Sequence, residues 1–256
     1  MTIAALVFGS LGTLTETSEL HRQAFNDTFA EEGLDWSWDD ATYRSLLDHV
    51  GGANRILAYA GRQPGGEERP PAWAAEIHAR KTARYAELVR STDLRLRPGV
   101  ERLLAEARSA GLRVGLATGT SVANIDASLT ATGNRLSLDD FDAHTVRDMI
   151  EHPKPAPDAH RRCVELLSVD PATAMAVEDS TDGVASAREA GLFVVATPGD
   201  FVRSQDFSAA GVVLSDLGDP GLPGQRLDGG PEPADGVATL EWLAAAVGLG
   251  PLTAAR

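Results

Sequence analysis

Three short clusters in the sequence contain residue types that bind phosphate groups and divalent metal ions. Thr118-Gly-Thr-Ser121 offers hydroxyls and backbone N–H groups, which can hold an oxyanion. Lys154-Pro-Ala-Pro-Asp158 offers a positive charge, and Glu178 and Asp179 offer the carboxylate oxygens that Mg²⁺ prefers. Taken singly, each cluster has a simpler explanation, because hydroxyls and acids often cap helices and Lys-Pro sequences often form surface turns. Their chemistry depends on whether the fold brings them together.

The elements that would position these clusters alternate between strand and helix patterns. Apolar runs predict strands over residues 3–8, 113–117, 173–177 and 192–196, and helical patterns cover residues 98–110, 122–130, 157–167 and 182–190. This alternation predicts an α/β fold, with a doubly wound, parallel, Rossmann-like sheet. Ligands of such sheets bind at the carboxyl ends of the strands, where the polar clusters fall. We therefore expect one site built from all of them.

Residues 18–92 interrupt the alternation with helical patterns alone, over residues 21–32, 38–49, 54–60 and 73–90. The pattern predicts an all-helical cap domain over 18–92, inserted into a discontinuous core domain of residues 1–17 and 93–216. Residues 218–236 are rich in Gly, Pro and Asp, which favours a flexible linker. Residues 238–247 could form one short helix, so residues 217–256 are expected to be a linker and a tail that docks on the core or reaches a protein partner.

The charge balance limits the classes of ligand. The chain has 256 residues and a net charge of −14, which argues against binding to nucleic acid or to an anionic membrane. Local cations could still bind a small phosphorylated ligand. Cys163 is the only cysteine, so it cannot form an internal disulfide, and residues 3–8 are too short for a signal peptide or a membrane span. We expect a cytoplasmic protein without an organic cofactor.

In order and spacing, the clusters resemble the motifs of the haloacid dehalogenase superfamily over residues 1 to about 215. Lys154 matches the lysine that neutralises the transferred phosphoryl group, and Glu178 and Asp179 match the acids that hold Mg²⁺. The resemblance implies phosphate binding by the residues that match the family's phosphate loops: Ser10, Gly12, Thr118, Gly119, Thr120 and Lys154.

The helical insert resembles the phosphohexomutase and phosphatase branch of that superfamily, which includes β-phosphoglucomutase, and most closely the xylulose-bisphosphate phosphatases. The matching segments include 16–17, 21–25, 34–38, 51–55, 77–82 and 96–99. The resemblance implies that substrate contacts come from Glu16, His21, Gly52, Arg55 and Lys81. A solvated helix face is the simpler explanation for Arg55 and Lys81, and a packing role is the simpler one for His21.

The chain departs from the family pattern in its first motif. Active members end the first strand with Asp-x-Asp-Gly-Thr, whose first Asp attacks phosphorus and ligates Mg²⁺ and whose second transfers protons. Gly9-Ser-Leu-Gly-Thr13 stands at that place here, with Gly9 at the nucleophile position and Leu11 at the acid/base position. Neither side chain can do that chemistry. The loss of one carboxylate also weakens the metal site formed by Glu178 and Asp179, so Mg²⁺ binding is expected to be weak or to depend on a bound phosphate.

Two functions remain open at this point. The first is a phosphate-ester-binding pseudophosphatase, in which the aspartyl-phosphate chemistry is lost. The second is an active phosphate-ester hydrolase that works by a different mechanism, with Glu16 or Asp179 as a general base. A carboxylate about 4 Å from a phosphate oxygen repels it by roughly 4 kcal/mol at an effective dielectric near 20. Without the two aspartates, the loops and Lys154 could therefore hold phosphate in the absence of metal.

Overall fold

The computed structural model describes residues 2–9, 11–49, 51–63 and 69–250. The chain forms two compact units. Unit 1 comprises Met1–Glu16 and Leu94–Arg256, and unit 2 comprises Thr17–Asp93. Each unit is described by itself below.

Unit 1 is built on a parallel sheet of six strands in the order β3-β2-β1-β4-β5-β6, so the predicted fold class is confirmed. The strands are β1 Ala5–Phe8, β2 Arg113–Ala117, β3 Ala143–Thr145, β4 Ala174–Glu178, β5 Phe193–Ala196 and β6 Val212–Val213. The chain adds β2 and β3 on one side of β1, and β4, β5 and β6 on the other. The order therefore reverses between β1 and β4, which is the place where doubly wound sheets bind ligands.

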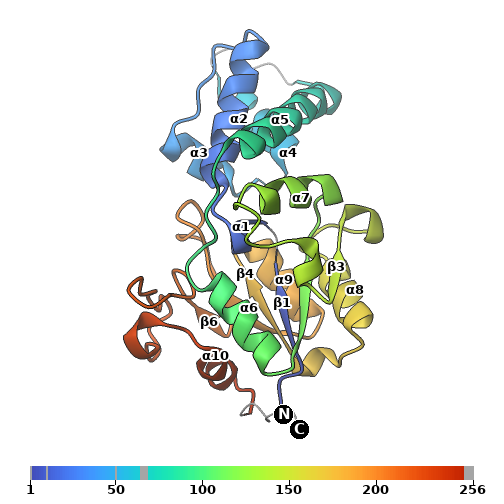
Figure 1. Ribbon diagram of the computed structural model, residues 1–256. Coiled ribbons are helices and arrows are strands. Elements are labelled where there is room, and N and C mark those ends of the chain that lie inside the picture. The colour runs from blue at the N-terminus through green and yellow to red at the C-terminus, as the bar shows by residue number, and fades with distance from the viewer. Residues whose placement is uncertain (1, 10, 50, 64–68, 251–256) are drawn as a thin grey trace. The chain divides into compact units, whose positions relative to one another are not determined.

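Helices cover both faces of this sheet (Figure 1). Alternate residues of β1 point to opposite faces: Leu6 and Phe8 belong to one buried cluster, and Ala5 and Val7 to the other. The first cluster includes residues of α6 Val100–Ser109, α7 Val122–Thr130 and α10 Leu240–Ala246, and the second includes residues of α8 Asp158–Leu167 and α9 Thr181–Glu189. Strands that are buried on both faces explain the continuous apolar runs in the sequence.

Short helical turns complete unit 1. The helix α1, Leu11–Leu14, follows β1 directly. Four 3₁₀ helices lie in connections, at Leu138–Asp140, Arg147–Met149, Pro171–Thr173 and Ala234–Gly236. The structure adds two short strands, β3 and β6, that the apolar runs did not predict, because strands of three and two residues are too short to show a period.

All the regular secondary structure in the described residues of unit 2 is helical. Its helices are α2 Ser18–Glu31, α3 Asp40–Leu46, α4 Gly52–Gly61 and α5 Pro71–Ser91. Aromatic rings fill the interior of the unit: the Phe25 ring centroid is 4.5 Å from that of Trp38, and Phe29 is 4.8 Å from Trp38. Trp36 packs edge-on against Trp73 at 6.0 Å. Trp36 and Trp38 are therefore packing residues.

The C-terminal segment, in which residues 218–236 were expected to form a flexible linker, packs against α6. Arg102 on α6 donates hydrogen bonds to the carbonyls of Leu217, Gly218 and Ala238. A Cβ on Gly218 would overlap the carbonyl of Gly236. Glycine in this segment thus permits close backbone packing, a role that composition alone does not distinguish from flexibility.

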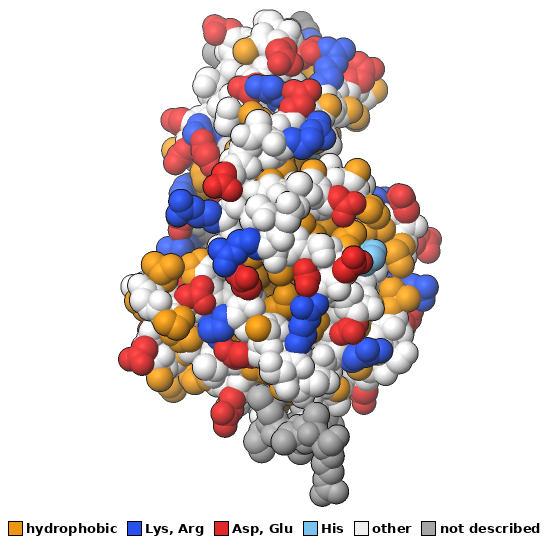
Figure 2. Space-filling view, in the orientation of Figure 1, with side chains coloured by type: hydrophobic (Ala, Val, Ile, Leu, Met, Phe, Trp, Pro, Cys, Tyr) orange, Lys and Arg blue, Asp and Glu red, His pale blue; other side chains and the backbone are white. Residues whose placement is uncertain are grey.

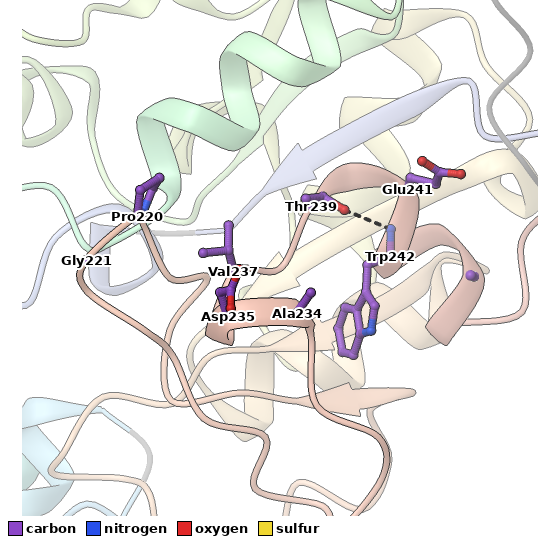
Figure 3. Close-up of a pocket in the computed structure, with 9 residues that line it drawn as sticks. Pro220, Gly221, Ala234, Asp235, Val237, Thr239, Glu241 and Trp242 are labelled. Atoms are coloured by element: carbon purple, nitrogen blue, oxygen red, sulfur yellow. Dashed lines mark hydrogen bonds between the residues drawn. The ribbon is translucent and has the colours of Figure 1, made fainter.

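A pocket of about 810 Å³ opens within this C-terminal segment (Figure 3). One wall comes from α10, where the Thr239 hydroxyl accepts a hydrogen bond from the backbone N–H of Trp242 at 3.1 Å. The lining residues are Pro220, Gly221, Ala234, Asp235, Val237, Thr239, Glu241, Trp242 and Ala245. None of them belongs to the polar clusters at the ends of the strands.

On the face shown in Figure 2, acidic and basic side chains are interspersed over the surface and do not gather by sign. That face offers no basic stripe of the kind that binds nucleic acid. Among the described helices, none combines the length and the apolar composition needed to cross a bilayer.

Candidate functional site

The end of β1 and the end of β4 lie side by side because their strands are paired in register, Phe8 with Val177. The backbone N–H of Gly9 donates to the carbonyl of Val177 at 2.8 Å, which places Gly9 beside Glu178. Leu11 begins α1 and is half-buried. Ser10, predicted to bind phosphate, lies outside the described residues.

The β1 loop also approaches Asp179 closely. The Thr13 hydroxyl donates to Asp179 Oδ1 at 2.8 Å, and a Cβ on Gly12 would overlap the Asp179 carboxylate. Only glycine therefore fits at position 12. Burial, together with the charge of Glu178, raises the pKa of Asp179 above its ordinary value. The loop holds Asp179 in place, but it does not compensate its charge fully.

The carboxylate of Glu178 is fully buried and is held by two nitrogen groups. Lys154 Nζ lies 2.5 Å from Glu178 Oε1, and His160 Nε2 lies 2.8 Å from the same oxygen. Burial alone would raise the pKa of Glu178, but Lys154 and His160 hold it below its ordinary value. Lys154 also donates to the carbonyl of Ala117 at 3.0 Å, so one of its three N–H groups is left for a ligand.

His160 is positioned by a second hydrogen bond on its far side. The Ser186 hydroxyl donates to the carbonyl of Ala156 at 2.7 Å, so its oxygen is left to accept from His160 Nδ1 at 2.9 Å. This fixes the ring with Nε2 aimed at Glu178, and it joins α8, α9 and β4 through buried polar groups.

The lack of a side chain at Gly9 and the position of Glu178 are directly related. A Cβ built on Gly9 would lie 2.5 Å from both Cδ and Oε2 of Glu178. Real Cβ atoms essentially never approach other atoms that closely. The Glu178 carboxylate thus occupies the space into which a side chain at position 9 would extend.

The loop after β2 offers the predicted phosphate donors. Thr118 is buried, and its hydroxyl oxygen accepts from the backbone N–H of Thr120 at 3.1 Å, so its own proton is free for a ligand. No described residue accepts a hydrogen bond from the backbone N–H of Gly119. Thr120 Oγ1 accepts from Asn124 at 3.2 Å and therefore supports the loop.

Arg97 ties the neighbouring loops together. Its guanidinium donates to four carbonyls in unit 1, those of Gly12, Thr197, Pro198 and Ser215, at 3.0, 2.5, 3.4 and 2.8 Å. The loops that follow β1, β5 and β6 are therefore joined by one side chain. Glu16 is exposed, and its carboxylate lies against Gly199 in the same group of loops.

The side chains of this site suit Mg²⁺ only in part. No group of three or more His, Cys, Asp and Glu side chains that could hold a metal occurs in the described ranges. Mg²⁺ often takes only one or two carboxylates, with water and phosphate oxygens completing the shell. Glu178 Oε2 has no hydrogen-bond partner among the described residues, and burial raises the pKa of Asp179. These two acids fit a weak site, because Lys154 and His160 already hold the other oxygen of Glu178.

Unit 2 contains a separate cluster of basic groups. Lys81 on α5 is only 4% exposed, and its Nζ lies 2.6 Å from Nδ1 of His21 on α2. Arg55 on α4 is half-buried and donates through Nε to the carbonyl of His49 at 3.1 Å. A Cβ on Gly52 would overlap the ring of His78, so this glycine permits the close approach of α4 and α5. The structure thus brings together four of the five residues predicted to contact substrate, all except Glu16.

The residues that surround this cluster are aromatic or positively charged. The His21 ring stacks on that of Tyr85 with centroids 3.9 Å apart, and Lys81 Nζ lies 4.8 Å from the centroid of Phe25. Burial, and then the charges of Lys81 and Arg55, lower the pKa of His21 well below its ordinary value. His21 is therefore neutral at pH 7 and can act as a hydrogen-bond acceptor or donor. The cluster therefore combines the charge of Arg55 with a buried amine, and no described acid forms an ion pair with either group.

The fold, the topological switch point and the phosphate loops together define the class of protein. The family described as haloacid dehalogenase-like hydrolase has a model that matches residues 3–191. The chain belongs to this family.

Individual relatives show which branch of the family this chain is similar to. The protein CbbY of Rhodobacter capsulatus is 44% identical over 217 residues, which cover 85% of this chain and 95% of the relative. The crystal structure of CbbY from Rhodobacter sphaeroides in complex with phosphate matches with a TM-score of 0.72 and 41% identity, over 84% of this chain and 95% of that one. A mutant of the same CbbY in complex with xylulose-(1,5)-bisphosphate matches with a TM-score of 0.73 and 41% identity, over 86% and 99%. The β-phosphoglucomutase of Clostridium difficile, at 22% identity and a TM-score of 0.63, shares the fold.

Sequence reasoning missed His160 and Ser186. Both lie in ordinary amphipathic helices, and nothing in the local pattern distinguishes them from core or surface residues. Their importance comes from contacts with a residue 18 positions away for His160 and 30 positions away for Ser186. One feature of the sequence could have identified His160, namely its position on the buried face of the helix that follows Lys154.

Proposed function

We propose that this protein binds a small phosphate ester at the carboxyl edge of the unit 1 sheet and that it has lost the aspartyl-phosphate chemistry of its family. One observation carries the proposal: the buried Glu178 carboxylate fills the space next to Gly9. A nucleophile at that position would need both a side chain and room for it. The chain has neither, so the protein is a pseudophosphatase.

The remaining groups suit a bound phosphate. The third N–H of Lys154, the Thr118 hydroxyl and the Gly119 backbone N–H are donors without another described acceptor. Charge-assisted hydrogen bonds to such donors are about twice as strong as neutral ones. When Mg²⁺ is bound, Glu178 and Asp179 would hold it, and the ion would offset the charge of the phosphate. The protein donors themselves do not require it.

The names of the relatives support a phosphorylated sugar as the ligand. The two CbbY crystal structures hold phosphate and xylulose bisphosphate. Each unit of this chain has a cluster that suits an anion, one around Lys154 in unit 1 and one around Arg55 and Lys81 in unit 2. The ligand class proposed here is therefore a sugar phosphate or bisphosphate.

The binding half of the proposal is tested by isothermal titration of the full chain with inorganic phosphate and with xylulose 1,5-bisphosphate, with and without Mg²⁺. We expect binding in both conditions, and about tenfold weaker phosphate binding by Thr118→Val, which loses one hydrogen bond. Thr173→Val is the matched control, because Thr173 lies at the opposite end of β4. Absence of binding, or strict dependence on Mg²⁺, would contradict the proposal.

The loss of chemistry is tested by assaying the same protein against a panel of sugar phosphates. We expect no turnover from the wild type and none from Gly9→Asp combined with Leu11→Asp, because Glu178 occupies the space that the new aspartate needs. Recovery of turnover in that double variant would show that the space can be vacated, and the structural argument would then be wrong.

A hydrolase with a different mechanism is the second candidate function. The raised pKa of Asp179 favours it, because a carboxylate whose pKa is raised is a stronger general base. Wild-type turnover that is abolished by Glu178→Ala or Asp179→Asn would support this alternative over the pseudophosphatase.

A further inference from the structure

The chain contains only two lysines among its 23 basic residues, Lys81 and Lys154. All other basic side chains except histidine are arginines, whose guanidinium group stays protonated in proteins. An amine can lose its proton and then attack a carbonyl carbon, which a guanidinium cannot do under the same conditions. The position of each lysine is therefore chemically informative. Lys154 is paired with the buried Glu178, whereas Lys81 is not paired with an acid.

The surroundings of Lys81 favour the neutral amine. Its Nζ lies 4.8 Å and 4.9 Å from the ring centroids of Phe25 and Tyr85, and the side chain is 4% exposed. The ion pairs that α5 makes with described carboxylates are those of Arg80 and Arg84, and Lys81 has none. The amine is thus buried among aromatic rings with no described counter-ion.

The charged and titratable groups that face Lys81 reinforce this effect. They are His21 from α2, Arg55 from α4, and His78 and Tyr85 from α5. None of them carries a negative charge at neutral pH. Burial, and then the charge of Arg55, lower the pKa of Lys81 to about 7. Desolvation beside a second cation is one of the ways in which proteins make lysine amines nucleophilic.

We propose that Lys81 is a carbonyl-reactive amine that forms an imine with a small phosphorylated aldehyde or ketone. The lone pair of Nζ attacks the carbonyl carbon, a C–N bond forms, and the carbonyl π electrons move to oxygen. That oxygen takes up, one after the other, the two protons that the amine releases, and it leaves as water while the C=N bond forms. No oxidant or reductant is needed.

His21 and Arg55 would assist this step. Nδ1 of His21 lies 2.6 Å from the amine, so it can accept the amine proton and return it to the leaving oxygen. The Arg55 guanidinium uses only its Nε in the hydrogen bond to His49, which leaves its terminal N–H groups for a phosphate. The ligand class rests on the proposed function, but the reactivity of the amine does not.

Reductive trapping of the full chain tests the proposal. The protein is incubated at pH 7 with glycolaldehyde phosphate and cyanoborohydride, and the adduct is located by peptide mass spectrometry. We expect one adduct, on Lys81, and no adduct from Lys81→Arg. Arg80→Lys is the matched control, because it adds an exposed amine at the adjacent position of α5. At pH 7 that new amine should react at least about tenfold more slowly than Lys81, since an ordinary lysine is almost fully protonated.

Two further measurements distinguish an activated amine from an amine that is merely exposed to solvent. The rate of adduct formation at Lys81 should be half-maximal near pH 7, whereas the rate at position 80 should still rise above pH 9. His21→Asn should slow trapping at Lys81 by about tenfold, as expected for loss of a positioned proton acceptor. Equal labelling of Lys81 and the amine at position 80, or no adduct on Lys81, would overturn the proposal.

The outcome is separable from that of the proposed function. If titration detects phosphate binding that Thr118→Val weakens, and Lys81 does not react, only the imine proposal fails. If Lys81 reacts but phosphate binding is absent, only the proposed function fails. Unphosphorylated glycolaldehyde is the second probe, and equal trapping of both aldehydes would overturn the role of Arg55 in phosphate recognition.

Discussion

The two lysines of the chain lie in opposite electrostatic environments. In unit 1, Lys154 is 2.5 Å from the buried carboxylate of Glu178, and the two charges compensate each other. In unit 2, Lys81 faces aromatic rings, two histidines and an arginine. Lys154 thus gains from its charge, whereas Lys81 is destabilised by it. The same residue type contributes a fixed cation in one unit and a titratable amine in the other.

Under the proposed function, the site of unit 1 has lost its reaction and kept its ligand chemistry. In unit 1, the groups that would bind phosphate remain, and a buried ion pair occupies the space beside Gly9. In unit 2, no described acid balances the basic cluster, so burial of that cluster costs stability. The stability of each unit should therefore respond differently when its lysine is removed.

Removal of the two lysine charges should give the largest contrast. Lys154→Met leaves Glu178 buried with only His160 as a partner, and loss of one member of a buried ion pair typically costs about 3–5 kcal/mol. Lys81→Met replaces a destabilised cation with an apolar chain and should therefore raise the free energy of unfolding at pH 7. Urea denaturation at pH 7 in phosphate-free buffer measures both. Equal losses would mean that the two environments do not differ in this way.

The second-largest contrast is expected in the pH dependence of stability. Because the folded state lowers the pKa of Lys81 from its ordinary 10.5 to about 7, the unfolded chain binds more protons between these values. The free energy of unfolding should therefore rise with pH in this window, by up to about 1.4 kcal/mol per pH unit, and fall as the pH drops towards 7. Urea denaturation at pH 7.5, 8.5 and 9.5 measures the slope. Lys81→Met should reduce it and Thr82→Val should not, and an unchanged slope in Lys81→Met would count against the buried amine.

The smallest effect is expected at two glycines. Gly9→Ala places a Cβ 2.5 Å from the Glu178 carboxylate, and overpacking of this kind costs about 1–3 kcal/mol. Gly61→Ala, at the end of α4, meets no atom within 4 Å and should be neutral or stabilising by up to about 1 kcal/mol. Thermal denaturation of both variants checks this. If Gly9→Ala is as stable as the wild type, Glu178 is not confined by its neighbours.

The sheet and the phosphate loops were predictable from sequence because their signals are local. Strands buried on both faces give unbroken apolar runs, and β1, β2, β4 and β5 lie within one or two residues of the predicted spans. The carboxyl-edge rule then placed Thr118, Glu178 and Asp179 in one region. Gly9 and Leu11 stood out because they differ from the two aspartates that the family pattern has at these positions.

The remaining features depend on distant contacts. His160 becomes significant only when α8 places it against β4, and Lys81 only when α2 places an aromatic ring and His21 beside it. The glycines of residues 218–236 look flexible in composition, but a Cβ on Gly218 would overlap the Gly236 carbonyl. A side-chain environment of this kind arises from tertiary packing and leaves no periodic pattern in the sequence.

Arg97 joins the backbones of four residues that lie far apart in the chain, from Gly12 to Ser215. Loops that are hydrogen-bonded to one guanidinium cannot fluctuate independently, because the opening of any one loop exposes the charged Arg97 side chain that binds them all. Local unfolding at this edge should therefore be cooperative, and the amide hydrogens of the three loops should exchange with a common opening free energy. Motion of the phosphate-binding edge would then be a two-state event, and a ligand that orders one loop would order the others with it.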